Sequence, residues 1–425
     1  MLSEKGKKLK NIKYSNYKSV FSILRQADSR SIRDISHEIH LSNTAVAKII
    51  NALLEKNMVY PSGKGESTSE GGKRPELFSV NKDYRYAMVL QADTCIIKCC
   101  IFDLACQLRC EVICECGQEA SYAEYLDKCA AAVSKVLMKM QIPLAKILGC
   151  CIAFPGIIDS AAGVVVYPVW FPTWGKNLNF CEDLCSRLSF DMKMLIENNS
   201  RLNSYAQFSE FADHRQHGSY VGISSSADHM CVTPGVGGCI FNNNHIRRGM
   251  NGYAGEFGHI TVDYHDNENC VCGRKGCLQT ITAPRRMVNY AYERREKHPD
   301  STLWKIDTLR RLELRDIFAE ANRGDPLAME VVDVAITYYA RAIENIILTV
   351  DPEYILFTGS FKCGGDYFLN KLKKRIHEAG LFGSVNALHI QYGKYSAEEA
   401  VLVGSALYLF DSFLNQDDYY ADENT

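Results

Sequence analysis

The sequence predicts an α/β protein that consists of a small N-terminal helical domain and a larger two-lobed body. Two observations support this fold class. A chain of 425 residues is too long for one ordinary core and suits two or three domains. From Tyr86 onward, short runs rich in β-branched residues alternate with helical stretches, which is typical of α/β architecture. We therefore divide the chain into a domain of residues 1–82, a smaller lobe of residues 83–196 and 400–425, and a larger lobe of residues 197–399.

Three helices are expected near the N-terminus. Between Tyr17 and Gln26, and again in SIRDISHEIHLS after the N-cap types Asp28 and Ser29, apolar residues recur at three- and four-residue spacing. In the third segment, NTAVAKIINALLEKNMV, they form one stripe and polar residues stand at the start. Helix, tight turn and helix of this length present a recognition helix to the major groove of DNA. An ordinary three-helix packing unit is the alternative. The candidates for base contacts are Asn43, Thr44 and Lys48.

A wing is expected next, because MVYPSGKGESTSEGGKRPELFSV has the pattern strand, polar tip, strand. The tip carries Lys73 and Arg74 among glycines and a proline, and arginine in such an arm is suited to a narrow minor groove. Residues 1–82 hold 15 Lys and Arg against 8 Asp and Glu, a net charge of +7, whereas the remainder carries −9. This asymmetry favours double-stranded DNA as a partner. A flexible basic linker is the alternative.

The compartment is expected to be the reducing cytoplasm. The start MLSEKGKKLKNIKYSNYK lacks the apolar region of a signal peptide, so the 18 cysteines do not indicate a disulfide framework. No uninterrupted apolar run reaches the length of about 18 residues that a membrane span needs, and we expect no membrane contact.

A zinc site is predicted in GEFGHITVDYHDNENCVCGRKGCLQT, where His259, Cys270, Cys272 and Cys277 fall within nineteen residues. Three thiolates and one imidazole make a closed tetrahedral site, which is structural because it leaves no open position for a reacting water. Cytosolic cysteine clusters of this kind more often bind metal than form disulfides. The alternatives for the fourth ligand are His265 and Asp266.

That segment and the one before it, TPGVGGCIFNNNHIRRGMNGYAGEFGH, resemble the ROK family of sugar kinases and sugar-responsive repressors. CIAFPGIIDSAAGVVVYP, IENNSRLNSYAQF and DPEYILFTGS resemble further family segments: the sugar-side segment, the catalytic Asn-Asp segment and the second phosphate-side turn. The resemblance implies a ribonuclease-H-like or actin-like two-lobed kinase fold with structural zinc. An N-terminal winged helix-turn-helix with a link such as GGKRP resembles the repressor branch of the family.

At the positions where the family places its kinase chemistry, this chain differs. The first phosphate loop, approximately Asp-x-Gly-Gly-Thr in the family, matches QADTC, so Gln91 replaces the acid and Asp93 and Thr94 replace glycines. Side chains there obstruct a phosphate, and a carboxylate repels it. The family's catalytic Asp is Asn199, and an amide does not accept a proton at neutral pH. We expect neither ATP binding nor phosphoryl transfer; a one-residue shift of the alignment would leave Glu197 as a base.

Sugar recognition needs hydrogen-bond donors and acceptors but no base, so a pocket between the lobes can still bind a sugar after the kinase activity is lost. Matching the family's sugar contacts one by one gives Gly156, Asn198, Asn199, Glu256, His259 and Gln279. The family has Glu where Gln279 stands, so the ligand can differ from glucose or N-acetylglucosamine, and a phosphosugar near Arg247 and Arg248 is an option beside a solvated turn for that pair. For Asn198 and Asn199 the alternative is a capped strand-to-helix turn, and for Glu256 a helix-start carboxylate.

The sequence therefore predicts a DNA-binding transcriptional regulator, specifically a repressor of carbohydrate-utilisation genes. A sugar or sugar phosphate bound between the lobes is expected to change its affinity for an operator, and palindromic operators imply a homodimer or homotetramer. One alternative is an active sugar kinase with an appended DNA-binding domain. A constitutive DNA-binding protein with a vestigial pocket is the other.

Overall fold

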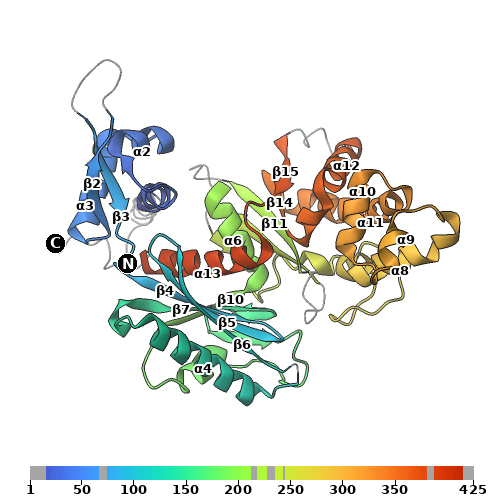
Figure 1. The fold of residues 1–425 in the computed structure, drawn as a ribbon, viewed down its shortest axis with the longest axis horizontal. Coiled ribbons are helices and arrows are strands. Elements are labelled where there is room, and N and C mark those ends of the chain that lie inside the picture. The colour runs from blue at the N-terminus through green and yellow to red at the C-terminus, as the bar shows by residue number, and fades with distance from the viewer. Residues whose placement is uncertain are drawn as a thin grey trace.

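The computed structural model describes residues 16–66, 74–117, 119–211, 218–226, 235–242, 245–380 and 387–414 (Figure 1). Among these residues, none of the helices combines the length and apolar character that crossing a bilayer requires. The chain forms a small N-terminal unit and two five-stranded sheets, and helices separate and cover the sheets.

The N-terminal unit contains a helix over residues 16–25, α2 (Ile32–Ile39), α3 (Asn43–Glu55) and a small sheet. Its strands β1 (Arg30–Ser31), β3 (Glu76–Val80) and β2 (Val59–Lys64) pair in that order. Ser31 caps α2 through a reciprocal capping box with Asp34, so the expected caps Asp28 and Ser29 were wrong. The cap lies later because Arg30 and Ser31 pair with β3 before the helix begins.

A tight turn separates α2 from α3. His40 adopts the left-handed conformation (φ 54°) that ends α2, and the Ser42 hydroxyl accepts a hydrogen bond from the Ala45 N–H at the start of α3. The apolar stripes of both helices face Phe21 of the first helix within one buried cluster. The turn and the shared core therefore hold the polar start of α3 on the outer surface.

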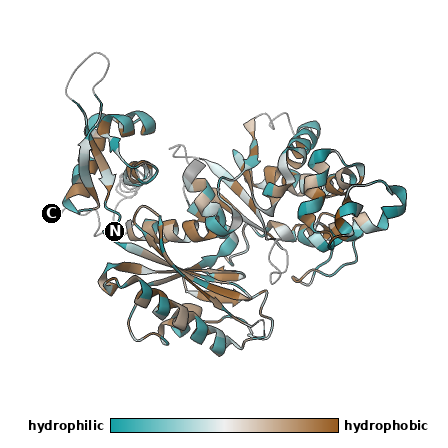
Figure 2. Cartoon of the chain, in the orientation of Figure 1, coloured by the Kyte–Doolittle hydropathy of each residue, from teal (hydrophilic) through white to brown (hydrophobic). Residues whose placement is uncertain are grey.

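The first sheet has the order β10 (Met194–Asn198), β7 (Ile147–Phe154), β4 (Tyr86–Ala92), β5 (Ile96–Asp103), β6 (Leu108–Glu115). Helices α4 (Tyr122–Met140) and α5 (Phe180–Cys185) cover one face, and α13 (Ala397–Leu414) crosses the other. A hairpin of β8 (Ile157–Asp159) and β9 (Val164–Tyr167) follows β7. In Figure 2 the strands of this sheet are largely brown, as expected for strands covered on both faces.

The second sheet has the order β13 (His245–Arg247), β12 (Gly235–Asn242), β11 (Ser219–Ser226), β14 (Tyr354–Gly359), β15 (His389–Tyr392). Helix α6 (Asn199–Phe211) lies on one face. The other face forms a second core with the remaining helices, whose bounds are α7 (Leu278–Ile281), α8 (Pro284–Glu293), α9 (Leu303–Asp307), α10 (Leu314–Arg323), α11 (Pro326–Val350) and α12 (Gly365–Glu378).

Helices α6 and α13 pack on each other between the two sheets. Glycines allow close contact on both sides of α6. A Cβ atom added at Gly404 of α13 would lie 1.9 Å from the Leu202 carbonyl oxygen, and one at Gly237 of β12 would lie 2.0 Å from the Ser200 hydroxyl. A Cβ atom added at Gly222 of β11 would likewise lie 2.2 Å from the Ser204 hydroxyl oxygen. Small and polar residues thus bring α6 against the second sheet.

The sequence patterns anticipated β4, β5, β7, β10, β12 and β14 but missed β11. Its sequence, SYVGISSS, is rich in serine and contains a glycine, because α6 leaves no room for larger side chains on that face. The part of the expected strand at residues 229–234 lies outside the described residues. Helix α13 packs on the first sheet while its predecessor β15 belongs to the second, and the division into two lobes at residues 197 and 400 stays a prediction.

Candidate functional site

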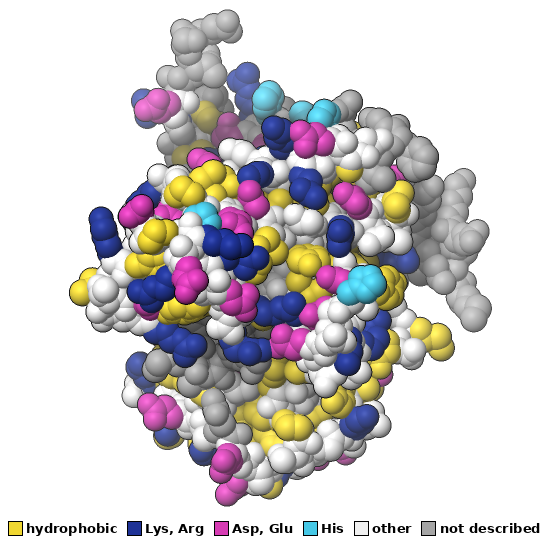
Figure 3. Space-filling view, turned by 90° about the vertical axis from the view of Figure 1, so that its right-hand side faces the viewer, with side chains coloured by type: hydrophobic (Ala, Val, Ile, Leu, Met, Phe, Trp, Pro, Cys, Tyr) yellow, Lys and Arg dark blue, Asp and Glu magenta, His cyan; other side chains and the backbone are white. Residues whose placement is uncertain are grey.

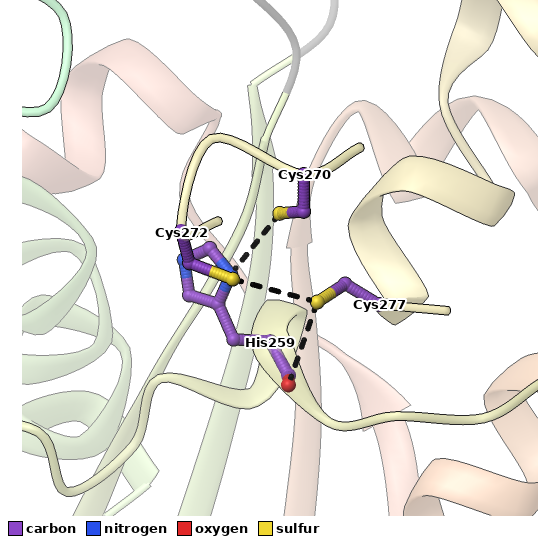
Figure 4. Close-up of side chains that lie close together, drawn as sticks. All are labelled: His259, Cys270, Cys272 and Cys277. Carbon is purple, nitrogen blue, oxygen red and sulfur yellow. Dashed lines mark hydrogen bonds between the residues drawn. The ribbon is translucent and has the colours of Figure 1, made fainter. Parts of the chain in front are cut away.

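His259, Cys270, Cys272 and Cys277 converge at one point beside the second sheet (Figure 4). Their ligand atoms all lie within 4.8 Å of one another. The Cys270 sulfur is 3.4 Å from His259 Nδ1, and the Cys272 and Cys277 sulfurs are 3.6 Å apart. The structure places neither His265 nor Asp266 in this cluster, because Asp266 pairs with Arg286 at 2.6 Å. The four residues form a candidate metal centre.

Local backbone geometry explains why this short segment gathers its sulfurs. The Cys270 N–H donates to the Arg274 carbonyl at 2.8 Å, which folds the chain between the cysteines into a hairpin. Gly276 has φ +74°, and a Cβ there would lie 2.0 Å from the Asp263 carbonyl oxygen. Only glycine satisfies both constraints, so Gly276 directs Cys277 back toward His259.

Hydrogen bonds around the cluster favour a thiolate. Burial alone raises the pKa of Cys270, but hydrogen bonds, first from the Cys272 backbone and then from Thr280 and the neighbouring cysteines, outweigh burial and lower it. Gln279 Nε2 donates to the Cys270 sulfur at 3.3 Å. The amide at position 279 therefore contacts the candidate metal centre directly, and an N–H donor to a ligating sulfur tunes such a centre.

Glu256 lies beside the cluster, where the short helix η2 (Phe257–His259) begins. Burial raises the pKa of the Glu256 carboxyl, and Arg201 and His259 oppose this effect. Its side chain does not cap η2, so the helix-start alternative does not account for it. His259 directs Nδ1 toward the Cys270 sulfur (Figure 4). The second ring nitrogen, Nε2, is therefore not the atom that points at this sulfur.

Asn198 and Gly156 are brought together, since Asn198 Nδ2 donates to the Gly156 carbonyl oxygen at 2.9 Å. Asn198 Oδ1 accepts from the N–H groups of Ser200 and Arg201 at the start of α6. This is the capped strand-to-helix turn that was the alternative for Asn198. The side-chain oxygen Asn199 Oδ1 accepts a hydrogen bond from the Ser200 N–H at 2.9 Å, and Asn199 is partly exposed.

Glu197 carries the strongest electrostatic interactions near this turn. Its carboxylate is fully buried and lies 3.1 Å from Arg201 Nη1 and 2.6 Å from Arg248 Nε. It also accepts hydrogen bonds from Ser160 and from the Asn198 N–H. A carboxylate engaged this fully is poorly suited to act as a general base. The solvated turn suggested for Arg248 was wrong, because its guanidinium points inward to Glu197.

Arg201 and Trp170 are candidates that sequence reasoning did not select, whereas Arg248 was named there as an option for binding a phosphosugar. Arg201 is 1% exposed and donates to the carbonyl oxygens of Gly252 and Ala254. Trp170 follows β9 and lies near Gln279, beside the start of β12. A Cβ atom added to Gly235 there would be 3.8 Å from both Trp170 Cζ2 and Gln279 Oε1. The sequence signal for Arg201 was its place in the first turn of a helix that directly follows a buried strand.

The turn that matches the first phosphate loop is closed by its own side chains. Asp93 Oδ1 accepts the Thr94 N–H at 2.7 Å, so the acid occupies a backbone donor that a phosphate would need. Thr94 is itself buried, and the Tyr125 hydroxyl donates to the Asp93 carbonyl at 2.7 Å. These contacts agree with the physical argument against a phosphate at this turn.

The turn after β14 is similarly crowded. Ser360 Oγ lies 2.8 Å from Ser225 Oγ, and the cavity beside them measures only about 20 Å³. Aromatic rings fill the surrounding space, with Tyr339 and Phe361 edge to face at 5.0 Å. A space of this size is large enough for one water molecule and too small for a nucleotide base.

The predicted DNA contacts lie on the surface of the N-terminal unit. Asn43, Thr44 and Lys48 of α3 are exposed, as is Arg74 before β3; Lys73 lies outside the described residues. The opposite end of the molecule differs in charge. Figure 3 shows basic and acidic side chains interspersed there, in agreement with ion pairs such as Arg294–Glu330 at 2.7 Å.

Comparison with known proteins agrees with these features. The family model described as ROK family matches residues 95–409. The chain is 21% identical to the xylose repressor of Bacillus subtilis, covering 95% of this chain and 97% of that protein, and 27% identical to the glucokinase of Halalkalibacterium halodurans, covering 59% and 73%. The crystal structure of a ROK family transcriptional regulator, a homologue of the Escherichia coli MLC protein, superimposes with a TM-score of 0.71 at 22% identity, covering 95% of this chain and 98% of that one.

Proposed function

The chain belongs to the ROK family, and we propose that it is a transcriptional repressor that binds DNA and responds to a sugar or sugar phosphate. Its N-terminal unit acts as a winged helix-turn-helix on cytoplasmic DNA. The two sheets belong to the two lobes of a sugar-kinase-like body. The observation that carries the proposal is the combination of exposed polar residues at the start of α3 with kinase positions whose chemistry is altered.

The placement of α3 supports DNA binding. The side chains of Asn43 and Thr44 stand exposed in its first turn, and Lys48 follows one turn later. N-terminal residues of a recognition helix reach base edges in the major groove. Lys64 at the end of β2 and Arg74 just before β3 stand exposed on the two sides of the expected wing tip, where cations contact phosphates or the minor groove. Palindromic operators require a homodimer or homotetramer.

The second part of the proposal concerns the effector. Gly156, Asn199, Glu256, His259 and Gln279 would face a sugar between the lobes, with His259 binding metal through Nδ1 and the sugar through Nε2. Asn198 positions this turn through its bonds to Gly156 and α6. Glu256 supplies a carboxylate that is not bound to another side chain in the described contacts.

We assign a structural zinc ion to the cluster at His259. The donor set fits, because three cysteine sulfurs and one imidazole nitrogen lie within 4.8 Å of one another and this set is characteristic of closed tetrahedral zinc sites. When bound, the ion would hold the segment from Glu256 to Gln279 in shape. Elemental analysis of the purified protein should find one zinc per chain, and the variant Cys277→Ser should lose it.

Kinase activity is proposed to be lost. Asn199 stands at the catalytic position, and Glu197 is held by two arginines. The Asp93 carboxylate accepts the Thr94 N–H, which a phosphate would need. The active sugar kinase remains an alternative because the family contains glucokinases. It predicts sugar-dependent release of ADP. A vestigial pocket, the other alternative, predicts that no sugar raises the melting temperature.

The test is a thermal-shift screen of the zinc-loaded protein with D-xylose, D-glucose, N-acetylglucosamine and the phosphates of the last two, each with and without ATP and magnesium. Binding raises apparent stability by mass action. A DNA duplex selected from a random pool then measures whether the same sugar changes DNA affinity. A shift with a sugar and none with ATP supports the proposal, whereas ADP release overturns the loss of activity.

A further inference from the structure

The first helix of the N-terminal unit is docked on the body of the molecule by charged contacts. Lys18 Nζ lies 2.6 Å from Asp411 Oδ2 and donates to the Tyr205 hydroxyl at 3.1 Å. Arg25 Nε donates to the Leu104 carbonyl at 3.0 Å, and its guanidinium lies 5.1 Å from the centre of the Phe410 ring. In Figure 1 this unit (blue) lies at one end of α13 (red).

The carboxylate of Asp411, which pairs with Lys18, is buried, so this ion pair fixes the position of the first helix. The side chain of Asp411 is 7% exposed and also accepts the Tyr205 hydroxyl. A buried carboxylate needs its partners, since leaving it unpaired is costly. Lys18 therefore fixes the helix over residues 16–25 at the place where α6 and α13 meet.

A second buried carboxylate, that of Glu197, lies at the residue pair that leads into α6. Glu197 pairs with Arg201 and Arg248, and Arg201 holds the carbonyl oxygens of Gly252 and Ala254. These two residues precede Glu256 by a few positions. Any ligand that moves the segment from Gly252 to His259 must act on Arg201 and Arg248.

Tyr408 connects the contacts of the two buried carboxylates. Arg248 Nη2 donates to the Tyr408 hydroxyl at 3.0 Å. The Tyr408 ring packs edge to face on Tyr205 at 5.6 Å, and Tyr205 bonds to Asp411, three residues after Tyr408 on α13. Glu197, Arg248, Tyr408, Tyr205, Asp411 and Lys18 thus form an unbroken series of contacts.

The backbone supplies a parallel connection. Arg248 directly follows β13, and Ile246 of that strand belongs to the same apolar cluster as Phe21 and the other buried residues of the first helix. Displacing Arg248 therefore disturbs a strand of the apolar cluster that also holds the first helix, as well as the hydrogen bond to Tyr408. Packed cores respond to such shifts by switching between discrete arrangements.

We infer that this series, from Glu197 through Arg248, Tyr408 and Tyr205 to Asp411 and Lys18, couples the proposed sugar site to the orientation of the DNA-binding unit. The inference rests on the proposed function for its two end points. Coupling is reciprocal, so a change at either end must be felt at the other. A purely local docking contact would lack this reciprocity.

Hydrogen exchange of the full-length protein tests the series without sugar or DNA. Tyr408→Phe removes the acceptor of Arg248 and keeps the ring, and we expect the amides of residues 16–25 to exchange about tenfold faster, the equivalent of one charge-assisted hydrogen bond. Lys18→Met should in turn speed exchange in residues 248–254. Acceleration of less than twofold at both distant segments overturns the inference.

The matched control is Tyr339→Phe, which removes a buried hydroxyl bonded to Thr282 at 3.1 Å in the other core. It should accelerate exchange near Thr282 and leave residues 16–25 unchanged; equal acceleration there by both variants also overturns the inference. A sugar from the screen that protects residues 252–259 should alter exchange in residues 16–25 of the wild type and not of Tyr408→Phe. If no sugar in the screen protects them, the proposed effector fails, while the variants still decide the coupling.

Discussion

Replacing Glu197 by glutamine is the sharpest test of the buried charge cluster. The change keeps the shape of the side chain and removes its charge. Arg201, 1% exposed, would then keep a buried positive charge whose nearest carboxylate partner, at 3.1 Å, is gone. Arg248, 2.6 Å away, would lose the same partner.

The magnitude follows from burial. Removing one partner of a buried ion pair costs about 3–5 kcal/mol, because the remaining charge is uncompensated. For a unit of roughly 200 residues this corresponds to a fall in melting temperature of about 6–20 °C. The expected loss lies at the upper end if both arginines remain charged and in place.

Glu330→Gln is the matched control. Glu330 also has two nitrogen-bearing partners at comparable distances, Arg294 at 2.7 Å and His298 at 3.1 Å, but its side chain is 39% exposed. Pairs that solvent screens contribute about 0–1 kcal/mol, so the melting temperature should fall by less than about 4 °C. Melting curves by circular dichroism compare the two variants. Equal shifts would refute the argument that burial sets the cost.

Other predictions follow from single features. Ala at Asp325, the N-cap of α11, should cost about 1–2 kcal/mol, measured by urea unfolding. Burial raises the pKa of Asp325, but its hydrogen bonds outweigh burial and lower the pKa. The stabilisation from this cap is therefore complete above the unfolded pKa of about 3.9 and disappears as the pH falls through the lower folded pKa. An Asp325→Ala variant with an unchanged acid transition would contradict this. Gly404→Ala should separate α13 from α6, since its Cβ would lie 1.9 Å from the Leu202 carbonyl, and lower the melting temperature by several degrees; wild-type melting would show that the crossing adapts. Arg74→Ala should weaken DNA binding and reduce the salt slope by about one unit, and an unchanged slope in titrations at several salt concentrations would remove Arg74 from the interface.

Local patterns predicted much of this protein. The cluster at His259 was accessible from the sequence because all four ligands fall within nineteen residues and a glycine turn brings them together. Helices α2 and α3 were accessible because their apolar spacing is regular. ROK family membership, which the motifs predicted, is confirmed by the family match over residues 95–409.

Contacts between distant segments were not predictable in the same way. Arg248 and Glu197 are 51 residues apart, and the partner of Lys18 is Asp411 at the other end of the chain. A sequence pattern contains no information about which buried carboxylate an arginine meets, so Arg248 was assigned to a solvated turn. The cap at Ser31 was missed for a related reason, since it depends on pairing with β3.

The contact between α6 and the second sheet has a mechanical consequence. At its N-terminal end, α6 presents the hydroxyls of Ser200 and Ser204 to Gly237 and Gly222, which have no side chains to interlock with the helix. At its C-terminal end, Phe208 packs against Tyr220 and Phe241 with ring centres 5.6 and 5.1 Å away. The aromatic end therefore resists sliding more than the serine end, so the second sheet would swing about the aromatic end in a shear motion, with the largest displacement at the glycines that face the serines.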